Sequence, residues 1–186
     1  MDPKILTAVI VLIVAILVVV AVLLVTRRRK TEHLKQKFGS EYDRVVHQHG
    51  DPQRGETVLV EREKRVAHLQ LRTLPAPERE RYAQQWASVQ RQFVDDPRRA
   101  VNQADRLVTD VMNARGYPMS EFNQRADDIS VNYPNAVGNY RTAHDIVVRH
   151  SKGQSSTEDL RKAMVHFRSL FDELLGKPGV AHKEVA

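Results

Sequence analysis

The chain has 186 residues, a net charge of +6 and no cysteine. Without cysteine it can form neither disulfides nor thiolate metal sites, and it has no thiol nucleophile. Residues 27–37 hold six basic residues and one acidic residue, whereas residues 38–186 hold 22 basic and 21 acidic residues. The excess charge is therefore local, and it does not support a broad nucleic-acid-binding face.

Residues 5–25 are apolar except for Thr7. At about 1.5 Å per residue, a helix of this length would span roughly 30 Å, the thickness of the hydrocarbon core of a bilayer. The stretch is longer than the core of a secretory signal, and basic residues follow it where a cleavage site would lie. We therefore predict an uncleaved signal-anchor, a single-pass transmembrane helix in contact with the lipid bilayer.

A basic collar, residues 26–37, follows the apolar stretch, whereas Lys4 stands alone before it. Basic residues that flank a membrane helix stay on the cytoplasmic side. This asymmetry predicts a short extracytoplasmic N-terminus, residues 1–4, and a cytoplasmic location for the rest of the chain. The side chains that we expect to contact anionic lipid headgroups are Arg27, Arg28, Arg29, Lys30, Lys35 and Lys37.

Glycine and proline divide the remaining chain into helical segments. The collar is expected to continue as helix to Phe38, and Ser40 with Asp43 resembles a capping box for a short helix ending near His49. An amphipathic helix is predicted over residues 53–73. Its charged run, residues 61–65, is interpreted as a solvated face carrying weak ion pairs between residues four apart.

The next predicted helix, residues 77–95, has the clearest apolar stripe of the sequence. The stripe consists of Tyr82, Trp86, Val89 and Phe93. Their spacing suits a core face, but it also suits a surface on which a partner helix docks. Both interpretations are left open.

Asp96 followed by Pro97 predicts an N-cap and the first turn of a helix that runs to Gly116. Ser120 is expected to cap a short helix that breaks at residues 132–134, and a further helix runs from there to Gly153. A last helix, capped around residues 154–157, precedes Gly176.

Almost no segment alternates with the period of a strand. The predicted class is all-α, with an N-terminal transmembrane helix before a bundle of about six helices over residues 38–176. Residues 177–186 are expected to form a flexible tail.

Several blocks of the sequence resemble an uncharacterised bacterial family of membrane-anchored helical proteins. The blocks are residues 39–44 (GSEYDR), 71–74 (LRTL), 86–97 (WASVQRQFVDDP), 104–107 (ADRL), 111–118 (VMNARGYP) and 156–161 (STEDLR). The resemblance covers roughly residues 38–175. It implies a bacterial origin and the helical architecture, and it assigns no activity, cofactor or catalytic residue. With a bacterial origin, the membrane predicted from the apolar stretch is the inner membrane.

The densest group of chemically capable side chains comprises Arg115, Tyr117, Asp127, Asp128, Arg141, His144 and Asp145. Carboxylates and a histidine can bind a divalent metal or exchange a proton. However, adjacent aspartates point about 100° apart on a helix, and no known metal-binding or nucleophile motif is present. The competing interpretation is that the aspartates pair with Arg115, Arg125 or Arg141 to fix one helix against another.

The leading hypothesis is a non-enzymatic, single-pass membrane protein that presents a helical adaptor or scaffold domain to a protein partner, without a cofactor or metal. The alternative is a small metal-dependent or acid–base enzyme that uses Asp127, Asp128, His144 and Asp145. A third hypothesis, tethering of DNA, would need a basic face that the charge count does not indicate. The sequence leaves the formation of a homo-oligomer open.

Overall fold

The computed structural model describes residues 3–176, except for the side chains of residues 3–11 and 14. The predicted flexible tail, residues 177–186, lies outside the described residues. The described chain contains eight α-helices and no strand, which confirms the all-α prediction, although seven helices rather than about six follow the first. The helices are α1 (Pro3–Phe38), α2 (Ser40–His49), α3 (Pro52–Ala67), α4 (Ala76–Asp95), α5 (Pro97–Ala114), α6 (Phe122–Asn132), α7 (Pro134–Ser151) and α8 (Thr157–Leu174).

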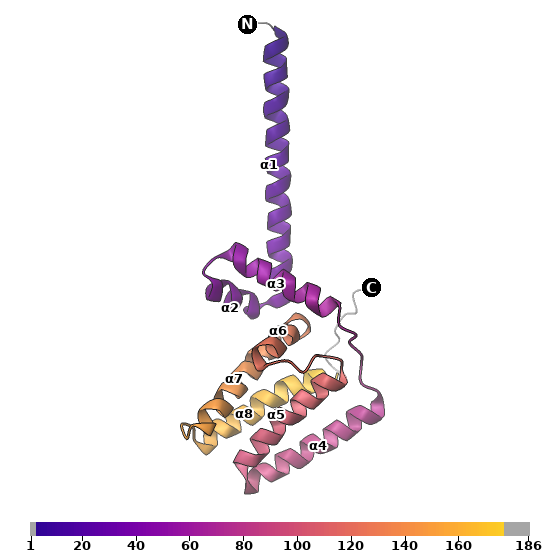
Figure 1. The fold of residues 1–186 in the computed structure, drawn as a ribbon, viewed down its shortest axis with the longest axis vertical. Helices are drawn as coiled ribbons and strands as arrows, with labels where there is room; N and C mark the ends of the chain where they lie inside the picture. Colours follow the sequence, from indigo (N-terminus) through magenta and orange to yellow (C-terminus); the bar gives the residue numbers. More distant parts are fainter. Residues whose placement is uncertain (1–2, 177–186) are drawn as a thin grey trace.

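Helix α1 extends away from the other helices as a single rod and meets them only at its C-terminal end (Figure 1). Its large apolar side chains between Leu12 and Val25 are roughly half exposed, at 46–61%. Further along, Leu34 and Phe38 are buried against α2 and α3. The helix is therefore part of the folded domain only through its last turns.

The predicted inner-membrane localisation, with a cytoplasmic helical domain, is corrected by this structure. Within the part of the chain that the structure describes, no helix is long and apolar enough to cross a membrane. Residues 5–11 and 14 of the predicted transmembrane segment lie outside the described side chains.

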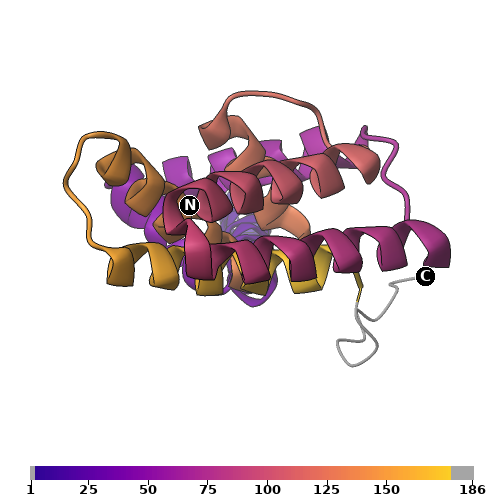
Figure 2. The same cartoon turned by 90° about the horizontal axis from the view of Figure 1, so that it is seen from below.

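Helices α4–α8 enclose the larger of two apolar cores, with α5 between α4 and α8 and with α7 beside α8 (Figures 1 and 2). Trp86 of α4 stacks on Phe171 of α8, with the ring centroids 4.6 Å apart. Tyr82, Trp86 and Val89 are buried, so the stripe of α4 is a core face over most of its length. Its last member, Phe93, is only partly buried.

The smaller core joins the end of α1 to α2 and α3. Gly55 allows α2 and α3 to approach closely, because a Cβ at this position would lie 2.9 Å from the Cα of Val46. Leu59 and Val66 bury the apolar side of α3 as predicted. The helix, however, ends at Ala67, several residues before the predicted end of residue 73.

Two helix caps were predicted correctly and two were not. The Asp96 carboxylate accepts a hydrogen bond from the Arg99 amide at 3.0 Å, and Ser156 forms a capping box with Asp159. In contrast, Gly39 is the N-cap of α2 and Glu121 is the N-cap of α6, and neither helix has a side-chain cap. A capping box needs its serine immediately before the first helical residue; Ser40 is already inside α2, and Ser120 lies one residue too early.

Candidate functional site

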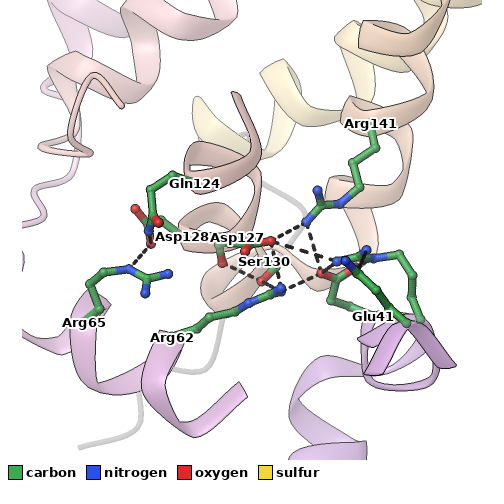
Figure 3. Close-up of polar contacts among 10 residues, drawn as sticks. Glu41, Arg62, Arg65, Gln124, Asp127, Asp128, Ser130 and Arg141 are labelled. Atoms are coloured by element: carbon green, nitrogen blue, oxygen red, sulfur yellow. Dashed lines mark hydrogen bonds and ion pairs between the residues drawn. The ribbon is translucent and has the colours of Figure 1, made fainter. Parts of the chain in front are cut away.

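Charged side chains meet where α2 and α3 pack against α6 and α7 (Figure 3). We call this group the junction cluster. Its members are Glu41 and Arg44 of α2, Arg62 of α3, Asp127 of α6 and Arg141 of α7. Three guanidinium groups thus surround two carboxylates that come from different parts of the chain.

Glu41 is the most buried member of the junction cluster, with 2% of its surface exposed. Its carboxylate accepts a bidentate pair of hydrogen bonds from Arg44, at 2.6 and 2.7 Å. It also accepts hydrogen bonds from Arg62 at 2.8 Å and from Arg141 at 3.3 Å. Removing a carboxylate from water costs free energy. Charge-assisted hydrogen bonds offset this cost only when they satisfy both carboxylate oxygens, as they do for Glu41.

Arg62 bridges the two carboxylates from α3 and is 4% exposed. Its Nη2 lies 2.8 Å from Asp127, and its Nη1 donates to Glu41 and, at 3.3 Å, to Ser130. Arg141 approaches the same Asp127 oxygen to 2.7 Å from α7. Asp127 therefore holds α3 and α7 to α6.

The pKa of the Glu41 carboxyl is lowered. Burial alone would raise this pKa, but the hydrogen bonds and positive charges of Arg44, Arg141 and Arg62 outweigh that effect. Burial also lowers the pKa of Arg62, against the opposing influence of Asp127 and Glu41. The Glu41 carboxylate is consequently ionised at neutral pH.

Asp128 points to a different neighbour from Asp127. Its Oδ1 accepts hydrogen bonds from Arg65 of α3 at 2.7 Å and from Gln124 at 3.0 Å. The two adjacent aspartates thus both pair with arginines, as the structural interpretation predicted. Of the three arginines predicted as partners, only Arg141 pairs with one of the aspartates, Asp127. The other partners, Arg62 and Arg65, were predicted to lie on a solvated helix face. For the buried Arg62 that prediction is wrong.

His144 and Asp145 do not join the aspartates. The His144 ring stacks on Phe122, with the centroids 3.5 Å apart, and Asp145 is exposed. Burial lowers the pKa of His144, and the negative charges of Asp105 of α5 and of Asp145 oppose that effect. The sequence reasoning missed Asp105, although it lies four residues after Val101 and hence on the apolar face of its helix.

The alternative enzyme hypothesis required Asp127, Asp128, His144 and Asp145 to converge, and they are distributed over separate places. Among the described residues, no three carboxylate or histidine side chains are placed to hold a metal ion together. Each of the two aspartates is instead bound by guanidinium groups.

Arg115 and Tyr117 lie apart from the junction cluster, beside a cavity of about 550 Å³ between the end of α5 and the start of α7. Arg115 donates to the Leu174 carbonyl at 2.6 Å, and Tyr117 accepts from Asn132 at 2.8 Å. Burial raises the pKa of the Tyr117 phenol, so this group stays protonated at physiological pH. These contacts fasten the connection between α5 and α6.

The basic collar is the continuation of α1. The side chains of residues 27–30 are exposed, Lys35 lies 5.7 Å from the ring centroid of Tyr42, and Lys37 pairs with Glu63 at 2.8 Å. Lys37 therefore has a role within the fold. Contact of the collar with anionic lipid stays a prediction.

No protein-family model matches the chain, and neither does any curated protein or solved structure. The resemblance to a bacterial family stays a prediction for the same reason. Any functional conclusion must therefore come from the residues and their geometry.

Proposed function

We propose that the protein is a non-enzymatic interaction module whose helical domain binds a partner protein in a groove between α4 and α8. The observation that carries this proposal is the groove itself. It has a volume of about 200 Å³. The two helices that line it, α4 and α8, lie in the half of the domain away from the rod of α1 (Figure 1). Its lining residues are Gln90, Phe93, Arg161, Met164, Val165 and Arg168.

The floor of the groove is apolar and accessible. Phe93 is only partly buried, and Val165 is 56% exposed. The first three residues of the apolar stripe of α4 pack in the larger core. The last residue, Phe93, lines the groove. An apolar helix face of a partner could continue this packing, in the manner of a helix laid into a groove.

Charge at the edges of the groove indicates the chemistry of the partner. Arg161 and Arg168 border the apolar floor. Each already has an acidic neighbour on α8: the exposed Glu158 lies 2.8 Å from Arg161, and the half-buried Asp172 lies 3.5 Å from Arg168. Exposed pairs of this kind are weak and are easily exchanged. The proposed partner is therefore an amphipathic helix with acidic residues beside its apolar face.

Site-specific photo-crosslinking in cells tests this proposal. A photoreactive amino acid at Val165 of the full-length chain should give one defined adduct, and the crosslinked peptide should be an amphipathic segment with acidic residues. A probe at Val148, which lies on α7 and is 38% exposed, provides the matched control and should not give that adduct.

The substitution Val165→Glu should abolish the interaction, because it places a negative charge on the apolar floor, whereas Val148→Glu should not. Equal crosslinking from both positions, or a partner that still binds the Val165→Glu variant, would refute the proposed groove.

A further inference from the structure

We infer that the cavity beside the junction cluster is a binding site for a phosphate group. This site shares no lining residue with the α4–α8 groove, so the inference does not depend on the proposed function. This cavity has a volume of about 390 Å³. All three arginines of the cluster line it, together with Gln48, His49, Val58, Asn123 and Asp127. It is thus formed by α2, α3, α6 and α7 at the point where these helices meet.

The charge of the cluster favours an anion. Arg44, Arg62 and Arg141 carry three positive charges, and Glu41 and Asp127 supply two negative charges within 4.0 Å of them. One positive charge is therefore in excess at a place where the central arginine is more than nine-tenths buried. Arg62 contacts both carboxylates, and Arg44 and Arg141 expose only 36% and 17% of their side chains, so water screens the excess charge incompletely. An anion in the cavity would neutralise this charge.

Two buried donor groups at this site have no partner in the described part of the chain. The Nε atoms of Arg62 and Arg141 are buried and have no hydrogen-bond partner among the described residues. Both side chains line the cavity. A guanidinium can donate to a phosphate oxygen from its Nε as well as from its terminal nitrogens. In Arg62 both terminal nitrogens already contact Glu41 or Asp127, so Nε is the donor left for an anion.

The surrounding side chains extend the donor set without adding negative charge. Asn123 and Gln48 carry amide groups, and both are exposed at the mouth of the cavity. Asp127 is the only acidic side chain in the lining, and it is already engaged by Arg62 and Arg141. Because the cavity is bordered by α2, α3 and α7 at once, a bound phosphate would connect the N-terminal helices to the larger core and raise the stability of the whole domain.

Titration of the full-length protein with inorganic phosphate tests the site, with sodium chloride at matched ionic strength as the reference. Phosphate should raise the midpoint of thermal unfolding in a saturable manner that chloride does not reproduce. Methyl phosphate in a parallel titration identifies the source: tighter binding of methyl phosphate indicates a phosphomonoester ligand, and tighter binding of inorganic phosphate indicates the free ion. No saturable effect of either compound would overturn the proposal.

Two variants locate the site. Asn123→Asp places a negative charge at the cavity and should weaken phosphate binding by at least about tenfold, because like charges oppose each other there. The new carboxylate lies in the first turn of α6, where it suits the helix dipole, so the fold should be preserved. Arg44→Gln should weaken binding by about tenfold through the loss of one charged donor.

Asn102→Asp provides the matched control, since it makes the same change at an exposed position of α5. This variant should bind phosphate like the unmodified protein. If Asn123→Asp and Asn102→Asp bind phosphate equally well, the site is not in this cavity and the inference is wrong.

Discussion

The two ends of the helical domain are held together by different interactions. Within the described residues, the larger core contains 28 buried apolar side chains. The smaller core contains seven, of which six come from α1–α3 and one, Val131, comes from α6. The smaller core is joined to α6 and α7 through the junction cluster, in which Glu41 and Arg62 are almost fully buried. Apolar burial supplies most of the stability of a domain and is not directional. A buried ion cluster adds little net stability, but its hydrogen bonds form only when the partners meet in one geometry.

Removal of a large side chain from the larger core should have the greatest effect. Phe167 is fully buried and meets Tyr140 edge to face, with the centroids 6.3 Å apart. Phe167→Ala should lower the free energy of unfolding by about 3–5 kcal/mol, because it removes apolar contacts and leaves a cavity. Urea denaturation measures this loss; a loss below about 1 kcal/mol would show that the larger core is not the main source of stability.

Loss of one carboxylate from the junction cluster should be nearly as damaging. Glu41→Gln keeps the shape of the side chain but leaves three buried or half-buried guanidinium groups with a single counter-charge. We expect a loss of about 3 kcal/mol in the free energy of unfolding, as is found when one partner of a buried ion pair is removed. Asp43→Asn, an exposed change on the same helix, is the control and should be close to neutral.

The junction cluster should also make stability depend on pH. The pKa of Glu41 in the folded protein lies below its usual value of 4.5, so the folded state favours the ionised form. Its contribution is therefore complete above about pH 4.5 and is lost as the pH falls through the lowered pKa. Denaturation measured between pH 7 and pH 3 should show a smaller decline for Glu41→Gln than for the unmodified protein, and equal declines would contradict this assignment.

The close contact of α2 with α3 should tolerate no added methyl group. In Gly55→Ala the new Cβ would meet the backbone of Val46, and overpacking of this kind costs about 1–3 kcal/mol. Gly138→Ala is the matched control, since a Cβ there meets nothing within 4 Å and alanine favours a helix. A Gly55→Ala variant as stable as Gly138→Ala would mean that the two helices can move apart freely.

The smallest effect is expected at an exposed ion pair. Arg161 pairs with Glu158 at 2.8 Å, as close as Arg62 lies to Glu41, but both side chains are more than half exposed. Arg161→Gln should leave the midpoint of thermal unfolding unchanged, because water already solvates both charges. A clear drop in this midpoint would show that distance rather than burial decides the importance of an ion pair here.

Much of the fold could be predicted from local patterns. The breaks at Gly39, Pro97 and Pro134, the cap at Asp96 and the apolar faces of α4, α5 and α8 all follow from residues close together in the chain. The candidate site was predicted less well. Arg62 was interpreted as solvated within a charged run, although it lies three residues after Leu59 and four before Val66, on the buried side of its helix.

The sequence by itself determined the helical class, the approximate helix limits and which helix faces are buried, because these depend on periodicity over a few residues. The tertiary structure alone decided which charges meet. Glu41 lies 21 positions from Arg62 and 100 from Arg141, and both hydrogen bonds converge on one carboxylate oxygen. No local pattern encodes such a meeting; it follows from the packing of four helices, which brings the arginines together in one cavity and leaves one positive charge in excess.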